Sequence, residues 1–457
     1  MEKLRNIYIV IFLFFIGSSF EVEAQSDLGL YGLRVVPQSN INNPVFITEG
    51  NIIIGIPFIS SISNTTYSSS FSFNDIFVTK NGSDSLYLNL SRLALESKEN
   101  NFVTECFEND IIYLGFRIKS NFLNLGIRNR LFSRVMYSND LVQLLWNGNY
   151  INEVMNLSNT FVNHDHFLSY YVGYAFRADD NMSFGIRVNL NQGLSSIQMS
   201  NNQLYINTVT HDQNVFSINA NTDFLINTSG ISNDSTGNDI SISEYIFNFK
   251  NIGFSVDFGA DFKMSERVKI NFSLLDLGFI NWNSNLTSYK SSSDYVEFSG
   301  ITTDINTTEN IFEAYADSIN KLIDIKKQEY KFKTFLPTRF FIGLEYYSID
   351  KSGRLSFVFS GTDLQYNFSP AISLGYDKTV SKNLTFKVNY SYLKYAPLNL
   401  GGGLVVNLQS FQFYILTDNI LSIINWRGQK YIHFRFGFNL VIRDPNSIKK
   451  RRTLMTY

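Results

Sequence analysis

The sequence predicts an all-β fold: a transmembrane antiparallel β-barrel of about 14 strands, with a hatch-like N-terminal segment and long extracellular loops. Three observations lead to this prediction. Apolar and polar residues alternate along many segments, as in strands whose two faces meet different surroundings. These segments run for about ten residues, the length at which a tilted strand crosses a membrane. An export signal precedes them.

Residues 1–24 have the pattern of that export signal. Lys3 and Arg5 form a positive start, Ile7 to Ile16 is an unbroken apolar core, and Val22-Glu23-Ala24 suits a cleavage site. The apolar core is shorter than the roughly 20 residues that span a bilayer, and the alternatives are an N-terminal membrane anchor or a buried helix. We expect cleavage after Ala24.

Residues 25–50 form the hatch-like segment. They mix turn residues (Pro37, Asn42, Asn43 and Pro44) with apolar ones and show no strand pattern. We expect an internal plug here, packed against a wall in which glycine recurs on the polar faces; barrel curvature is the other explanation of those glycines. The barrel is expected over residues 51–443, and residues 444–457 are expected to be a basic periplasmic tail.

The clearest alternating run covers residues 431–442. Ile432, Phe434 and Phe436 lie on one face, and His433 and Arg435 lie on the other. A soluble β-sandwich also alternates, but it would be broken by frequent turns into smaller domains. Only 7 of the residues are proline, which favours the barrel. Further runs cover residues 182–190, 254–262 and 384–392.

The alternation predicts strands of an even number, with both termini in the periplasm. Long links after residues 72, 131, 193 and 277 contrast with short turns elsewhere, as expected for extracellular loops and periplasmic turns. Within the long links we expect a hairpin (203–208 with 214–220), a helix at 140–146 capped by Ser138, and an amphipathic helix at 309–327. The predicted strands are 52–72, 111–119, 121–131, 166–177, 182–193, 253–263, 267–277, 337–347, 354–361, 371–377, 383–393, 402–408, 411–417 and 430–442.

Charged residues on the polar faces are the candidate lumen lining. Basic residues outnumber acidic ones among them, which predicts a mildly electropositive lumen suited to anionic solutes. The alternative is a ladder of internal ion pairs that fills the barrel. The candidates are Arg117, Arg128, Arg187, Asp257, Asp261, Arg339, Glu345, Arg354, Lys387, His433 and Arg435.

Several functions are not expected. The net charge of -2 gives no signature of nucleic-acid binding, and the single Cys106 excludes disulfides and cysteine-ligated zinc. His164-Asp165-His166 is at most a weak metal site. No nucleophile motif such as G-x-S-x-G accompanies the histidines, so we expect neither an enzyme nor a cofactor or metal site.

The chain resembles an uncharacterised family of Bacteroidota outer-membrane proteins, classed as a domain of unknown function. That family is distantly similar to FadL-type fatty-acid channels and to the PorV-type barrels of type IX secretion. The motifs that carry the resemblance are Pro37-Gln38-Ser39, Asn42-Asn43-Pro44, Leu144 to Asn149, Phe224 to Gly230, Leu274 to Gly278 with Trp282, Thr417-Asp418-Asn419 and His433 to Gly437.

The resemblance implies a barrel of about 14 strands in the outer membrane, closed by an N-terminal hatch. Two functions are expected. One is transport of a small hydrophobic or anionic solute past the hatch. The other is a non-conducting barrel that binds protein partners in secretion or surface assembly. Outer-membrane lipid is a partner in either case.

Overall fold

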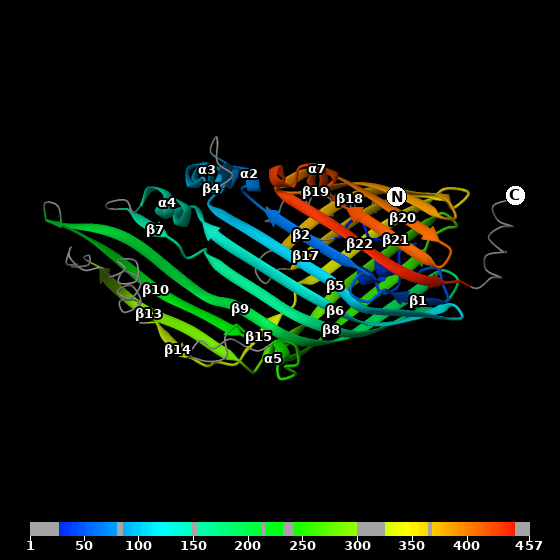
Figure 1. Cartoon of the computed structure of the whole chain (residues 1–457), viewed down its shortest axis with the longest axis horizontal. Helices are drawn as coiled ribbons and strands as arrows, with labels where there is room; N and C mark the ends of the chain where they lie inside the picture. Colours follow the sequence, from blue (N-terminus) through cyan, green and yellow to red (C-terminus); the bar gives the residue numbers. More distant parts are fainter. Residues whose placement is uncertain are drawn as a thin grey trace, which may run out of the picture.

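The computed structural model describes residues 27–79, 86–148, 153–212, 215–231, 242–298, 325–363 and 368–443. Fourteen antiparallel strand positions close into a barrel, which confirms the predicted fold class (Figure 1). The first position is filled by two short strands, β1 (Ile52–Gly55) and β2 (Ile62–Ser68). Both pair with β5 (Asn100–Ile118) on one side and with β22 (Tyr431–Ile442) on the other, so the barrel has no free edge.

The remaining wall strands follow in chain order, each hydrogen-bonded to the next. They are β6 (Asn121–Ser138), β8 (Phe161–Arg177), β9 (Met182–Asp212), β11 (Ile252–Lys263), β12 (Val268–Trp282), β16 (Thr338–Tyr347), β17 (Gly353–Asp363), β18 (Phe368–Ser381), β19 (Leu384–Leu393), β20 (Ala396–Leu408) and β21 (Phe411–Thr417).

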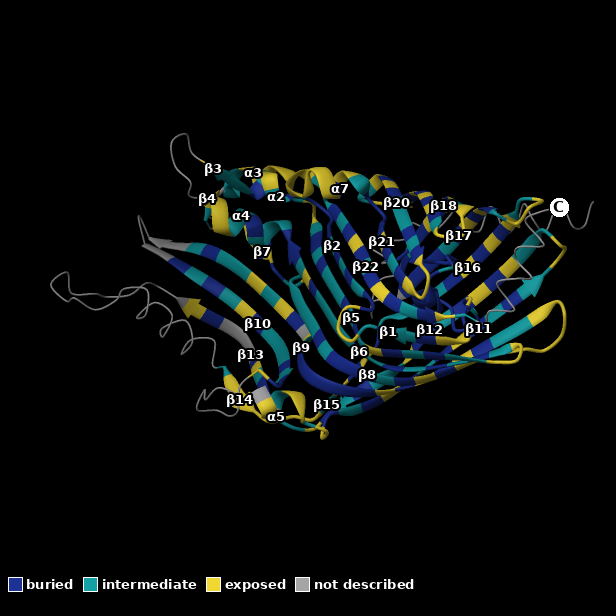
Figure 2. Ribbon diagram, turned by 45° about the vertical axis from the view of Figure 1, so that its right-hand side comes forward, coloured by how far each residue is buried: buried dark blue, intermediate teal, exposed yellow. Residues whose placement is uncertain are grey.

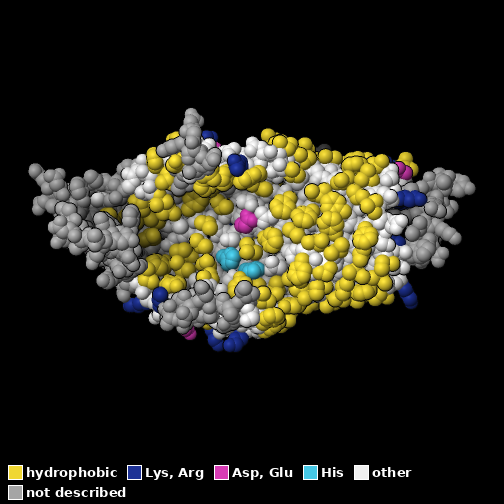
Figure 3. Space-filling view, in the orientation of Figure 1, with side chains coloured by type: hydrophobic (Ala, Val, Ile, Leu, Met, Phe, Trp, Pro, Cys, Tyr) yellow, Lys and Arg dark blue, Asp and Glu magenta, His cyan; other side chains and the backbone are white. Residues whose placement is uncertain are grey.

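Strand β19 shows why these sequences build a barrel wall. Phe386 and Val388 point outward and are 47% and 48% exposed, whereas Lys387 and Asn389 point inward and are 5% and 3% exposed. The same alternation recurs around the barrel (Figure 2). The outward side chains form a contiguous apolar belt (Figure 3). Exposed apolar surface of this extent is typical of barrels that span a membrane.

The prediction of long loops between strands was wrong in part, because several strands continue far into them. β9 runs to Asp212, where it turns into β10 (Val215–Ser229), and this hairpin was predicted. β10 pairs with β13 (Leu286–Phe298), and β13 pairs with β14 (Lys326–Gln328), so an extra sheet extends outside the barrel. Beyond the apolar belt the outward faces turn polar, so the chain stays extended without the apolar alternation that marks a membrane strand.

The short elements lie mostly at the ends of the wall strands. Helix α4 (Asn139–Asn147) confirms the predicted helix, and the Ser138 side chain accepts a hydrogen bond from the Leu141 amide. Most of the predicted helix at 309–327, its residues 309–324, lies outside the described residues. At its end, Lys326–Gln328 forms strand β14 instead of a helix. The others are η1 (Pro37–Ile41), α2 (Phe73–Ile76), β3 (Phe77–Thr79), β4 (Leu86–Leu88), α3 (Leu90–Glu96), β7 (Val154–Asn156), α5 (Ile242–Ile246), β15 (Phe332–Phe335), α7 (Ile420–Ile424) and η2 (Trp426–Gly428).

Helix α2 is held by a short polar motif. Ser72 and Asp75 form a capping box, and Asp75 also pairs with Arg92 of α3 at 2.8 Å. Burial opposes ionisation of Asp75, but the hydrogen bonds from Ser72 and the charge of Arg92 outweigh it and lower its pKa. Within the described part of the chain, no helix has the length and hydropathy to cross a membrane. The predicted signal peptide and basic tail lie outside the described residues.

Candidate functional site

Residues 27–50, here called the N-terminal segment, lie inside the barrel (Figure 1). Nearly all of them are buried. Their polar groups reach inward-facing residues on widely separated strands, so the segment crosses the lumen. Four contacts show this: the Gly29 amide to Asp418 at 2.7 Å, the Tyr31 hydroxyl to Asn271 at 2.7 Å, Gln38 to Asn439 at 2.8 Å, and Asn40 to the Tyr113 hydroxyl at 2.8 Å.

The start of the segment is anchored by Asp27. Its carboxylate accepts two hydrogen bonds from Arg435, at 2.6 and 2.8 Å, and one from His433 at 3.1 Å. All three side chains are almost completely buried. A bidentate arginine–carboxylate contact in such surroundings is a strong polar interaction. Arg435 also contacts Glu108 at 3.2 Å, which connects the segment to the wall network.

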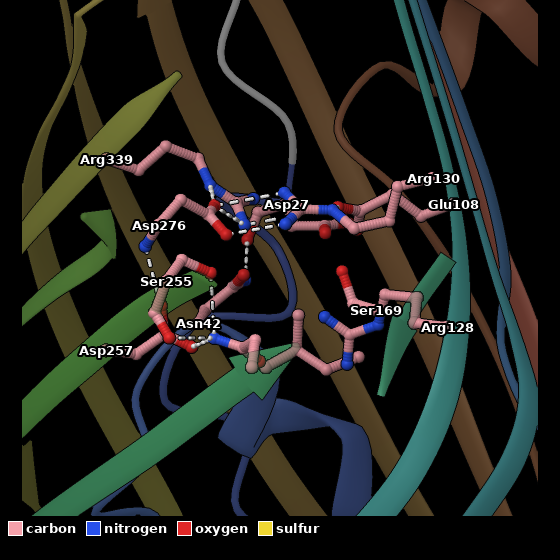
Figure 4. Close-up of polar contacts among 12 residues, drawn as sticks. Asp27, Asn42, Glu108, Arg128, Arg130, Ser169, Ser255, Asp257, Asp276 and Arg339 are labelled. Carbon is pink, nitrogen blue, oxygen red and sulfur yellow. Dashed lines mark hydrogen bonds and ion pairs between the residues drawn. The ribbon is translucent and has the colours of Figure 1, made fainter. Parts of the chain in front are cut away.

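A layer of charges crosses the lumen beside this anchor (Figure 4). Asp276 of β12 accepts hydrogen bonds from Arg130 of β6, at 2.5 and 3.0 Å, and from Arg339 of β16, at 2.7 and 3.0 Å. Glu108 of β5 contacts Arg130 at 3.1 Å. Strands β6 and β12 are separated in the wall by β8, β9 and β11, so these ion pairs bridge the interior. We call Glu108, Arg130, Asp276, Arg339 and Arg435 the charged layer.

A β-bulge in β12 delivers Asp276 to the lumen. The register with β11 shifts between Val256 and Phe258, and both Leu275 and Asp276 point inward. Asp276 has φ 61, which is unusual for a residue other than glycine, and its amide donates to Asp257 at 2.6 Å. Strict alternation would place Asp276 on the outer face, so the sequence pattern could not identify it.

A further group of charged lining residues holds the middle of the N-terminal segment. Arg34 contacts Asp261 at 2.8 Å and Glu345 at 3.1 Å. Arg354 contacts Glu345 at 2.8 Å and Asp377 at 2.6 Å, and the Lys387 ammonium donates to the Tyr31 carbonyl at 3.4 Å.

Three further predicted residues line the opposite wall. Arg187 contacts Asp257 at 2.6 Å and donates to the Asn40 carbonyl at 3.0 Å. Arg128 pairs with Asp110 at 2.8 Å. Arg117 donates to the Gly50 carbonyl at 3.2 Å, so this wall also binds the segment.

The Asn-Asn-Pro motif packs against glycines of the wall. A Cβ atom on Gly185 would lie 2.4 Å from the Pro44 carbonyl carbon, and one on Gly259 would lie 2.1 Å from the Asn43 Oδ1. Asn43 donates to the Phe272 carbonyl at 3.0 Å, and Asn42 donates to the Asp27 carbonyl at 3.1 Å. These two glycines therefore permit close approach of the segment.

The lumen holds more acidic residues than the sequence pattern predicted, and it also holds arginines outside the predicted set, Arg34 and Arg130. Residues 100–110 belong to a predicted loop, Asp276 lies in a bulge, and Asp27 lies in the N-terminal segment itself. The additional buried acids are Asp27, Glu108, Asp110, Asp165, Asp276 and Asp418. Most of the charges are paired, which corresponds to the alternative of an internal ion-pair ladder.

Toward the strand ends that carry the long links, the inner surface is aromatic. Tyr67, Phe102 and Tyr431 meet edge to face, with ring centroids 5.4 and 5.8 Å apart, and Tyr395 joins Phe102 at 5.6 Å. A second apolar cluster contains Phe167, Ile280, Trp282 and Leu336. An apolar lining therefore follows the charged layer along the lumen.

The weak metal site is not assembled. His164 and His166 point outward and Asp165 points inward, where it accepts a hydrogen bond from Ser196 at 2.8 Å. His166 instead binds Tyr245 and Asn129, both at 2.7 Å. Among the residues that the structure describes, no group of three or more histidine, cysteine or acidic side chains is placed to hold a metal ion.

No curated protein matches the chain. Similar solved structures include a FadL homologue of Pseudomonas aeruginosa, with 11% identity, a TM-score of 0.46, and coverage of 93% of this chain and 100% of that chain. The toluene transporter TbuX of Ralstonia pickettii is 8% identical, with a TM-score of 0.41 and coverage of 89% and 94%. The toluene transporter TodX of Pseudomonas putida is 8% identical, with a TM-score of 0.39 and coverage of 93% and 94%.

A family model matches residues 44–418, from the Asn-Asn-Pro motif to the loop after β21. The match includes most of the barrel wall and the bulge at Asp276. The chain belongs to the family of unknown function DUF5723.

Proposed function

We propose that the protein is an outer-membrane transport barrel in which the N-terminal segment is the hatch for a small hydrophobic solute. The observation that carries the proposal is the mode of attachment of that segment. Many hydrogen bonds and ion pairs attach the segment to the wall, beside apolar contacts such as those of Leu33 and Val36. Water can replace each hydrogen bond at a net cost of only about 1 kcal/mol, so such a segment can leave while the wall stays closed.

The nature of the solute is argued from the inner surface. The aromatic lining around Phe102 and Tyr431 suits an apolar body. Together with Asp27, which pairs with Arg435, the charged layer holds three acidic residues and three arginines, so it offers no net attraction to an anion. The proposal therefore favours a hydrophobic solute over an anionic one.

Conductance in a planar bilayer tests the hatch. The full chain is compared with a variant that lacks residues 25–50 and with Asp27→Asn. Asp350→Asn is the matched control, because Asp350 is an exposed residue in the turn between β16 and β17. We expect current steps in the deletion variant, occasional steps in Asp27→Asn, and silence in the control.

Partial block of the open variant tests the solute class. Toluene and benzoate share a ring and differ in charge. Block by toluene alone supports a hydrophobic solute, whereas block by benzoate alone contradicts it.

A second function is favoured by the sheet of β9, β10, β13 and β14 outside the barrel. Such a sheet offers a large surface to a protein partner in secretion or surface assembly. Silence of both the full chain and the deletion variant, with heat-modifiable gel mobility showing a folded barrel, would favour this function. Neither function includes catalysis, and we propose that the protein is not an enzyme.

A further inference from the structure

Residues 245–250 run along the outside of the barrel wall, where a polar cluster fastens them. The Tyr245 hydroxyl donates to His166 Nδ1 at 2.7 Å, because His166 Nε2 donates to the Asn129 side-chain oxygen. Ser195 contacts the same hydroxyl at 2.9 Å, and Gln192 donates to the Ile246 carbonyl at 2.7 Å. Polar side chains on the outward face of the wall thus hold residues 245–250 in place.

The fastened peptide presents apolar side chains away from the wall. Phe247 is 70% exposed and Phe249 is 50% exposed, and Ile246 is exposed as well. Phe249 also contacts the ring of Tyr170, which belongs to the outward face of β8. The exposed rings therefore continue the apolar belt of the barrel at the border where the outward wall residues become polar.

Exposed lysines lie next to Phe249 in the sequence and on the neighbouring strands. Lys250 follows Phe249 directly, and α5 lies beside β15 and near β14 in both ribbon views (Figures 1 and 2). The Lys333 ammonium lies 4.4 Å from the centre of the Phe279 ring, and that of Lys327 lies 5.8 Å from the Tyr289 ring. Glu329 is the one acidic residue of β14, β15 and the residues between them. Aromatic rings next to exposed lysines are typical of the boundary between lipid tails and phosphate headgroups.

We propose that Ile246, Phe247, Phe249, Lys250, Lys327 and Lys333, here called the rim, dock onto the lipid surface. The rings enter the edge of the apolar layer and the lysines bind the phosphate headgroups of the outer leaflet. The occupant is argued from continuity with the apolar belt and from charge complementarity. This inference rests on the proposed outer-membrane location.

Depth-dependent fluorescence quenching tests the docking. The full chain is made with Cys106→Ser and one new cysteine that carries an environment-sensitive fluorophore. Phe249→Cys reports the rim, Leu400→Cys on β20 reports the belt, and Glu96→Cys on α3 reports an exposed site outside it. Vesicles contain lipids spin-labelled at the headgroup or in the middle of the chain.

We expect the rim probe to be quenched most by headgroup labels, the belt probe by mid-chain labels, and the α3 probe by neither. A quenched belt probe with an unquenched rim probe would overturn the rim and leave the membrane location intact. If the belt probe is also unquenched, the membrane location itself fails.

Charge reversal tests the headgroup contact. Vesicles of phosphatidylcholine are compared with vesicles that contain phosphatidylglycerol. The anionic lipid should strengthen headgroup quenching of the rim probe, and Lys327→Glu with Lys333→Glu should abolish this gain. The control is Lys382→Glu, which lies in the exposed turn between β18 and β19 and should keep the gain. Equal quenching in both lipids would refute the role of the lysines.

Discussion

Asp27 and Arg435 form a buried bidentate ion pair although 408 positions separate them in the chain. The pair joins the first described residue to the last strand of the barrel. Because both side chains are shielded from solvent, loss of either partner leaves an uncompensated charge in the interior. The attachment of the N-terminal segment therefore depends strongly on this one contact.

Asp27→Asn should weaken that attachment. Loss of one partner of a buried pair costs about 3–5 kcal/mol, and the contact of Arg435 with Glu108 favours the lower end of this range. Limited proteolysis should cleave the N-terminal segment faster in the variant, while the barrel keeps its heat-modifiable mobility. Asp350→Asn, in an exposed turn, serves as the control. Equal cleavage rates in the two variants would contradict the anchor.

Asp276 allows the ion pairs to be separated from the backbone geometry. Asp276→Ala and Asp276→Gly both leave Arg130 and Arg339 without their shared carboxylate. Only glycine accepts φ 61 without strain, so Asp276→Gly should be more stable than Asp276→Ala by about 1 kcal/mol. Both should unfold at lower denaturant concentration than the parent. Equal stabilities would show that the bulge stores no strain.

Gly185→Ala should displace the Asn-Asn-Pro motif. The new methyl group would lie 2.4 Å from backbone atoms of Pro44 and Val45, and backbone cannot rotate aside as a side chain can. Overpacking of this kind typically costs about 1–3 kcal/mol. Gly402→Ala is the control, because there the methyl meets only the flexible Ile420 side chain. Proteolysis of the N-terminal segment should accelerate in the first variant and not in the second.

The packing of α2 should depend on pH through Asp75. Its pKa is lowered in the folded state, so the stabilisation is present above the unfolded pKa of about 3.9 and is lost as pH falls through the lower folded value. Phe73 of α2 contacts Trp426, with ring centroids 5.0 Å apart, so the fluorescence of Trp426 reports this packing. In a Trp146→Phe background, acidification should change the tryptophan emission as Asp75 gains a proton, and Asp75→Asn should abolish this change. A change of emission that persists in Asp75→Asn would show that another group titrates.

The wall could be predicted from the sequence because a membrane strand imposes a simple rule on its outer face. In β22 every second residue must be apolar, and this leaves His433 and Arg435 facing inward. This alternation of apolar residues ends where a strand extends beyond the apolar belt. Residues 100–110 of β5 carry Glu105 and Asn109 on the outer face, and they resemble a loop in sequence although they are paired on both sides.

The partners of the lumen residues could not be predicted. The pairing of Asp27 with Arg435 depends on the path of a segment whose one regular element is the short helix η1, and the position of Asp276 depends on one extra residue in β12. Neither the path of the segment nor the bulge is visible in the periodicity of the sequence. The histidines of β8 show the opposite case, since alternation itself separates Asp165 from His164 and His166 and disperses the apparent motif.

Closure of the barrel by β22 has a consequence for the order of assembly. The binding partners of Asp27 belong to β22, and that strand must pair with β1, β2 and β21 before His433 and Arg435 reach their positions. The N-terminal segment can therefore dock fully only after β22 has closed the wall. In an incomplete barrel Asp27 would lack its partners, so the docked segment indicates a closed barrel.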